Sequence, residues 1–102
     1  MFDKSRIIKN KKLIYVTYEQ FDFLKQLKKE RNYHNLSEVI ESLLKDFQPQ
    51  FNKTFAIGSN LKQIAVSGDV WTDLMQRKVM YQQTVSSIIQ HYIELIKTNN
   101  VG

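Results

Sequence analysis

The sequence contains no cysteine, which excludes disulfides and thiolate metal sites. It has one proline and three glycines, and 42% of its residues are hydrophobic, so the composition is that of an ordered, helix-rich protein. No apolar stretch approaches the length of a membrane span, and residues 1–12 lack the apolar core of a secretory signal. We therefore expect a cytoplasmic protein without a membrane partner.

Residues that carry out chemistry are also scarce. The two histidines, His34 in a predicted turn and His91 on a predicted helix, have no carboxylate or cysteine at the spacing of a metal site or catalytic triad. No glycine-rich phosphate loop occurs. We expect no enzyme activity, no cofactor, no metal and no small-molecule substrate.

The 102 residues suffice for one domain, or for two subdomains that share a core. The formal net charge of +5 makes a polyanion such as nucleic acid a plausible partner. Residues 1–12 carry most of this excess, with five basic residues against one acidic residue. Residues 1–10 are therefore either a basic arm that follows a polyanion or a frayed, solvated terminus.

Residues 11–30 align with residues 61–80 without a gap. Six of these positions are identical, where residue frequencies predict about one. The identical pairs are Lys12 and Lys62, Ile14 and Ile64, Val16 and Val66, Leu24 and Leu74, Gln26 and Gln76, and Lys28 and Lys78. We interpret the chain as a duplicated unit.

Each copy begins with a short run of alternating residues. Ile14 and Val16 share one face of the first run, and Ile64 and Val66 share one face of the second. This alternation predicts two half-buried strands.

Helix caps follow both strands. Thr17 with Gln20 forms a capping box, and Ser67 caps the second copy. The apolar stripes of these first helices are Phe21, Leu24 and Leu27 in one copy, and Trp71, Leu74 and Met75 in the other.

A second capped helix follows in each copy. Asn35 with Glu38 begins one and Thr84 begins the other, and the turn before Thr84 is one residue shorter. The apolar faces are Val39, Ile40, Leu43, Leu44 and Phe47, and Ile88, Ile89, Tyr92, Ile93 and Ile96.

One such unit has no partner for its strand and cannot bury its apolar faces. Two fused copies solve both problems, so we expect a mainly α fold with a short antiparallel β-ribbon. Residues 11–47 and 61–97 would be the two units, sharing one core as an intramolecular pseudo-dimer. The linker, residues 48–60, is apolar enough to lie on the body of the domain. A plain helical bundle with an accidental repeat is the alternative.

The succession of strand, capped helix, turn and second capped helix, beginning NLSEVI or TVSSII, resembles the ribbon-helix-helix family of DNA-binding regulators, the MetJ and Arc superfamily. The resemblance covers about 11–47 and 61–96. The tandem form is similar to small single-chain regulators of archaeal viruses, which would act in the host cytoplasm. The resemblance implies two fused ribbon-helix-helix units, a transcription regulator, double-stranded DNA as partner, and possible self-association along DNA.

In this family the ribbon enters the major groove and its outward side chains read bases. With the alternation above, the outward residues are Lys11, Leu13, Tyr15, Leu61, Gln63 and Ala65. Lys11 would reach guanine, Gln63 would pair with adenine, and the apolar residues would touch thymine methyl groups.

The family typically has polar residues at these outward positions, whereas this chain is more apolar there. Reversed strand parity, with Lys12 and Lys62 facing DNA, therefore stays open. Because the two reading faces differ, we expect an operator that is an imperfect inverted repeat.

The resemblance also implies that the second helix of each unit begins on a phosphate. The implied phosphate contacts are Asn35, Leu36, Ser37, Thr84, Val85 and Ser86, with Arg6, Lys9, Lys12 and Lys62 as further basic contacts. From the residues alone, Asn35 and Thr84 are better explained as helix caps, and only the resemblance favours the phosphate role.

A protein-interaction module, such as an antitoxin-like or adaptor protein, is the competing hypothesis. Its binding surface would be the apolar linker or the tail IKTNNVG.

Overall fold

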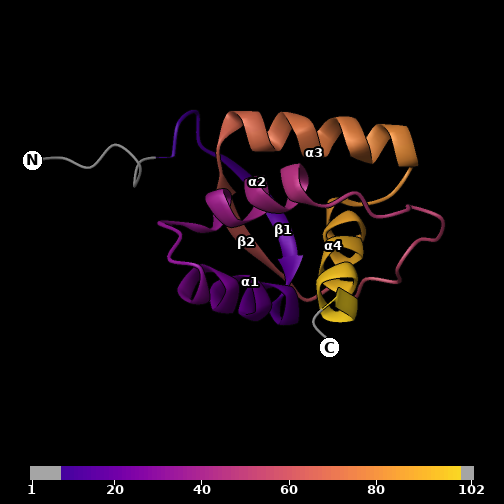
Figure 1. The fold of residues 1–102 in the computed structure, drawn as a ribbon. Coiled ribbons are helices and arrows are strands. Elements are labelled where there is room, and N and C mark those ends of the chain that lie inside the picture. Colours follow the sequence, from indigo (N-terminus) through magenta and orange to yellow (C-terminus); the bar gives the residue numbers. More distant parts are fainter. Residues whose placement is uncertain (1–7, 100–102) are drawn as a thin grey trace, which may run out of the picture.

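The computed structural model describes residues 8–99, which form four helices and a two-stranded antiparallel sheet (Figure 1). The elements are β1 (Lys12–Thr17), α1 (Tyr18–Glu30), α2 (Leu36–Asp46), β2 (Leu61–Val66), α3 (Gly68–Tyr81) and α4 (Val85–Asn99). Both predicted strands are present and paired with each other, so the alternative of a plain helical bundle is wrong.

The sheet is a ribbon with one buried face and one exposed face. Ile14 lies opposite Ile64 at its centre, and these two side chains are buried together with Val16 and Val66. Leu13 points to the other side and is 47% exposed. The predicted strand parity is confirmed and the reversed parity is wrong, because four aliphatic side chains on one face bury more apolar area than the mixed opposite face.

All four helices begin after the residues predicted to cap them. Thr17 and Gln20 form the reciprocal capping box, with each side-chain oxygen 3.0 Å from the other residue's backbone nitrogen. The side chains of Ser67, Asn35 and Thr84 each accept the N–H three residues further on, at 2.9 to 3.2 Å. These bonds satisfy backbone donors that a helix leaves unpaired.

The turns between the paired helices begin with the same backbone geometry. Asn32 and Gln82 have positive φ angles of 58° and 54°. The residue after each donates its N–H to the carbonyl of Lys28 or Lys78, at 3.0 and 3.2 Å. The extra residue of the first turn is therefore His34, directly before the α2 cap.

The helices pack crosswise on the ribbon. α4 contacts β1 and α2 contacts β2, while α1 contacts α4 and α2 contacts α3. Figure 1 shows α1 and α3 on opposite sides of the molecule, with the ribbon, α2 and α4 between them. Each second helix therefore covers the strand of the other half of the chain.

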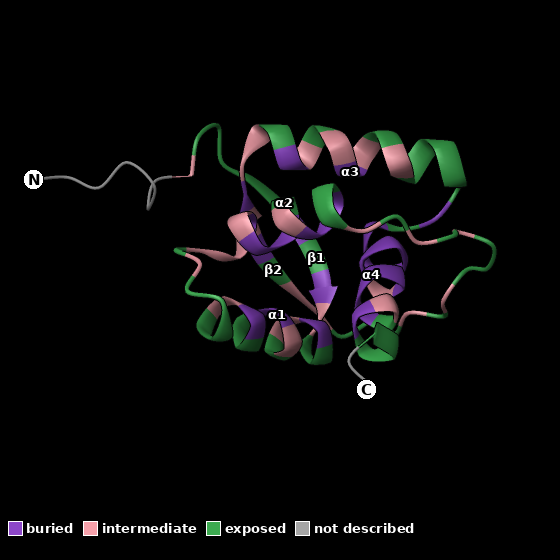
Figure 2. Ribbon diagram, in the orientation of Figure 1, coloured by how far each residue is buried: buried purple, intermediate pink, exposed green. Residues whose placement is uncertain are grey.

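Burial follows the predicted stripes on the second helices (Figure 2). Every apolar residue predicted for α4 is buried, as are those of α2 except the half-buried Phe47. On α3 the prediction is confirmed for Leu74, which is buried, whereas Trp71 and Met75 are half-buried and Val70 is buried instead. The buried side chains form one hydrophobic cluster, and the half-buried ones pack against it.

The linker lies on the body of the molecule, as predicted. Phe51 stacks on Tyr81, with ring centroids 4.2 Å apart, and meets the edge of His91 at 5.0 Å. The His91 Nε2 lies 2.9 Å from the backbone oxygen of Lys53, and the Phe55 backbone N–H donates to a serine hydroxyl of α4. His91 is thus a packing histidine that holds the linker.

None of the helices in residues 8–99 combines the length and the apolar character needed to cross a membrane. The predicted tail begins inside α4, which continues to Asn99.

Candidate nucleic-acid interface

The exposed face of the ribbon carries two cross-strand pairs, one on each side of the central isoleucines. Tyr15 lies opposite Gln63, and Leu13 lies opposite Ala65. Tyr15 is 51% exposed, Gln63 is exposed and Ala65 is half-buried. Four of the predicted base-reading residues therefore lie together on one face.

The two remaining base-reading candidates lie at the margins of that face. Lys11 is exposed and precedes β1 by one residue. Leu61 is half-buried and lies opposite Thr17, at the end of the ribbon.

The polar pair is hydrogen-bonded. Gln63 Nε2 donates to Tyr15 Oη at 2.7 Å. Because the partner hydroxyl belongs to a rigid ring, this bond restricts the direction of the glutamine amide.

Lys12 and Lys62 share the parity of the buried face but keep their amines at the edge of the core. The Lys12 amine lies 5.4 Å from the ring centroid of Trp71, and the Lys62 amine lies 4.7 Å from that of Phe21. The stems lie along apolar surface while the charges rest over aromatic faces. Both lysines therefore reach the protein surface from inward strand positions.

The starts of α2 and α4 flank the ribbon, and their serines bond inside the protein. Ser37 Oγ accepts the backbone N–H of Ser67 at 2.8 Å, and Ser86 Oγ donates to Gln20 Oε1 at 2.7 Å. Both serines are buried. Since their hydroxyls already have partners, a phosphate here would rely on backbone N–H groups.

The other residues of the two helix starts differ in exposure. Asn35 and Leu36 are half-buried, Thr84 is exposed, and Val85 is buried. A ligand from solvent would therefore meet the caps, Leu36 and the backbone, and not Val85.

The two helix starts also differ in charge. Glu38 lies in the first turn of α2, where its carboxylate accepts the His34 N–H at 3.2 Å and lies 2.9 Å from His34 Nδ1. The first turn of α4 has no acidic residue. Because a carboxylate at a helix start competes with any other anion, the α4 start is the more favourable phosphate site.

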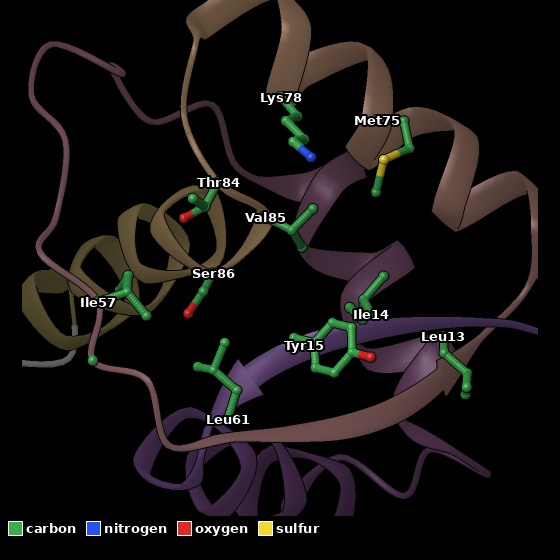
Figure 3. A pocket seen from close by; sticks show the side chains of 11 residues that line it. Leu13, Ile14, Tyr15, Ile57, Leu61, Met75, Lys78, Thr84, Val85 and Ser86 are labelled. Carbon is green, nitrogen blue, oxygen red and sulfur yellow. The ribbon is translucent and has the colours of Figure 1, made fainter.

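A cavity of about 420 Å³ joins the exposed ribbon to the start of α4 (Figure 3). Its walls include three predicted base-reading residues and three predicted phosphate contacts, with residues of α3 and the linker completing them. The lining residues are Leu13, Ile14, Tyr15, Ile57, Gly58, Leu61, Met75, Lys78, Thr84, Val85 and Ser86. The fold thus brings both predicted classes of contact to one hollow.

Lys78 and Met75 line this hollow, and neither was among the predicted DNA contacts. Figure 3 shows both side chains extending from α3 beside the ribbon. For Lys78 a signal was available, because Lys28 and Lys78 are one of the identical pairs of the repeat.

The basic arm is described only from residue 8. Arg6 lies outside the described residues, whereas Lys9 is exposed. The backbone oxygen of Lys9 accepts the N–H of Gly68 at 3.0 Å, which ties the arm to the start of α3. This bond fixes the backbone of Lys9 beside the start of α3.

Comparison with known proteins finds no match for this chain, whether among family models, curated proteins or solved structures.

Proposed function

We propose that the chain is a tandem ribbon-helix-helix protein whose two halves form an intramolecular pseudo-dimer, and that it regulates transcription by binding specific double-stranded DNA. The observation that carries this proposal is the exposed face of the antiparallel ribbon, whose side chains lie beside a helix start and a lysine in one hollow.

The pseudo-dimer is supported by contacts that occur twice. Each contact between two residues recurs between their counterparts, which lie 50 positions away in the sequence. Lys12 lies over Trp71 and Lys62 over Phe21, which are the same contact with the halves exchanged. The strand register is centred on the pair of Ile14 and Ile64, which are counterparts. Such reciprocity is the signature of a two-fold interface.

The DNA role is supported by shape and charge. A two-stranded ribbon fits the major groove, where base pairs present distinguishable donors, acceptors and methyl groups. With the ribbon in the groove, the α4 start and Lys78 lie beside it, where the DNA backbone passes. The net charge of +5 adds a favourable, salt-dependent term.

The two reading faces are unequal, so the expected operator is an imperfect inverted repeat. The protein would act as a repressor or activator in the cytoplasm, with self-association of copies along DNA as a further possibility.

The test is a selection from random duplex DNA, followed by titration of the winner and of an unrelated duplex at several salt concentrations. We expect one short imperfect inverted repeat to be preferred by about a thousandfold or more. Equal, weak binding to every duplex with one salt slope would contradict the proposal.

Two double variants separate the interface from general charge. Replacing Lys12 and Lys62, the phosphate contacts implied on the two strands, by glutamine should weaken binding and reduce the salt slope, since each lost phosphate contact lowers the slope by about one. The matched control replaces the exposed Lys45 and Lys97, which removes the same charge from the ends of α2 and α4. Equal effects of both pairs would contradict the assigned interface.

One observation favours a protein-interaction module as a second candidate. Val79 and Met80 at the end of α3 are 78% and 68% exposed, and with Trp71 and Met75 they line an open apolar hollow. On α1 the counterparts of Trp71 and Met75 are Phe21 and Lys25. The Lys25 amine lies over the Phe21 ring, so this surface is charged. If Val79→Ser with Met80→Ser abolished function in cells while DNA binding persisted, this second role would be indicated.

A further inference from the structure

The two pairs on the exposed ribbon face are counterparts with different chemistry. Tyr15 and Gln63 correspond, 50 positions away, to Ala65 and Leu13. A two-fold rotation about the central Ile14 and Ile64 therefore places a hydrogen-bonded polar pair where the other side has an apolar pair. The two sides of the ribbon present different groups at equivalent distances from the centre.

The tyrosine acts on the glutamine and leaves its recognition groups available. A glutamine amide has two N–H groups and one carbonyl oxygen. The 2.7 Å bond to Tyr15 Oη uses one N–H of Gln63. The second N–H and Oε1 are the donor and acceptor that match adenine N7 and N6 in the major groove.

The apolar pair has no donor or acceptor in its side chains. Leu13, 47% exposed, and Ala65 can only contact apolar groups on a base edge. In the major groove the thymine 5-methyl group is the one apolar feature of the four bases.

We propose that the ribbon reads an A·T pair on each side of the operator centre by a different group. Gln63, aimed by Tyr15, binds adenine on one side, and Leu13 with Ala65 contacts a thymine methyl group on the other. Tyr15 is a positioning residue for Gln63. This inference rests on the proposed function and assigns the base and the atom that each side recognises.

The experiment replaces single bases in the selected duplex. 7-Deazaadenine lacks the N7 acceptor and deoxyuridine lacks the 5-methyl group, so each is substituted in turn at every adenine and thymine. We expect one 7-deazaadenine to weaken binding by about tenfold, because a bidentate pair discriminates by that order. We expect deoxyuridine to weaken binding at the equivalent position across the centre.

Variants assign the groups. Gln63→Leu should remove the sensitivity to 7-deazaadenine and leave the sensitivity to deoxyuridine unchanged. Tyr15→Phe keeps the ring, and it should reduce the discrimination between adenine and 7-deazaadenine while binding to unrelated DNA stays constant. In the Gln63→Leu background, Tyr15→Phe should have no further effect, since a positioning residue acts only through its partner.

A converse variant makes the ribbon symmetric. Leu13→Gln with Ala65→Tyr copies the polar pair onto the apolar side, and it should prefer a perfect palindrome of the adenine-containing half-site over the native operator. Retained preference for the native operator would overturn the inference.

Specific binding that no 7-deazaadenine substitution weakens would also overturn it, as would a Tyr15→Phe effect that persists without Gln63. Either result leaves the proposed function intact. That function fails separately, if no duplex is preferred in the selection.

Discussion

The two halves of the chain form the same elements, but they treat equivalent positions differently. Leu24 and Leu74 are both fully buried counterparts, whereas Gln20 of α1 corresponds to Val70 of α3. Tyr92 of α4 corresponds to Leu43 of α2, 49 positions earlier. The identical apolar pairs thus lie in the shared core, whereas Gln20 differs from its counterpart where one half makes a contact that the other lacks.

Gln20 illustrates such a one-sided contact. Its side chain accepts the Thr17 N–H and the Ser86 hydroxyl, and it donates to the Ser86 backbone oxygen at 2.9 Å. In the other half no glutamine intervenes, because the Ser67 N–H reaches Ser37 Oγ directly at 2.8 Å. Equivalent backbone groups are satisfied in both halves, by different routes.

The largest expected effect comes from the positions that the halves share. Leu24→Ala and Leu74→Ala should each lower the free energy of unfolding by about 2–5 kcal/mol. Each should shift both the helical circular dichroism and the Trp71 fluorescence, because one core serves both halves. Gln26→Ala and Gln76→Ala, at exposed counterparts, are the controls. A Leu24→Ala variant that left the Trp71 transition unmoved would show independent halves.

The next effect comes from the glutamine bridge. Gln20→Val, which copies Val70, should cost about 1–3 kcal/mol because it leaves the buried Ser86 hydroxyl and the half-buried Thr17 N–H without their glutamine partner. Urea unfolding measures the change against Gln26→Val on the exposed face of α1, which carries the same loss of helix propensity. Equal losses in both variants would mean that the bridge adds no stability.

A smaller effect is expected at the start of α3. Gly68 is the counterpart of Tyr18 in the other half. Residues of the N-terminal arm lie against Gly68, and a Cβ added there would lie 2.9 Å from the Cβ of Asn10. Gly68→Ala should therefore lower stability by about 1 kcal/mol. Asn10→Gly removes that Cβ and tolerates the φ of 52°, so the double variant should recover the loss. Absence of recovery in thermal unfolding would exclude this clash as the cause.

The smallest effect at neutral pH is expected at Tyr92. Its hydroxyl is buried and makes no hydrogen bond of good geometry among residues 8–99, although the Arg77 guanidinium lies near it, and its counterpart Leu43 is apolar. Tyr92→Phe should leave stability unchanged or raise it by up to about 1 kcal/mol. A clear loss of stability would show that the hydroxyl has a favourable partner.

The pH dependence of the same variant provides a second measurement. Burial raises the pKa of Tyr92 above its ordinary value of 10.0. The unfolded chain then releases the proton at lower pH than the folded chain, so the wild type loses stability as pH rises through the ordinary pKa. The phenylalanine ring of the Tyr92→Phe variant has no proton to release. The difference in stability between the variant and the wild type should therefore widen in alkaline solution, and a constant difference would contradict the raised pKa.

Much of the fold could be predicted because its signals are local. The alternation of Ile14 and Val16 predicted which face of the strand is buried, and Thr17 and Asn35 predicted where helices begin. Capping bonds join residues only three positions apart, so a short stretch of sequence is enough to predict them. The burial of Val70 in α3 was not predicted, because the choice between Val70 and Trp71 depends on what packs against the helix.

The residues of the candidate site could be predicted from the sequence, but the contacts between them could not. Strand parity identified Leu13, Tyr15 and Gln63 as outward residues, and all three lie on the exposed face. The bond between Tyr15 and Gln63 was not predictable, because it depends on a register that joins residues 48 positions apart. The place of Lys78 in the hollow depends likewise on how α3 packs beside the ribbon.

The repeat, the strand faces and the helix starts follow from the order of the residues alone, because each depends on periodicity or on a side chain bonding its near neighbours in the chain. Packing in three dimensions is what places α4 on β1, α2 on β2 and Lys12 over Trp71. These contacts join distant residues, and their geometry exists only once both halves bury their apolar faces in one core.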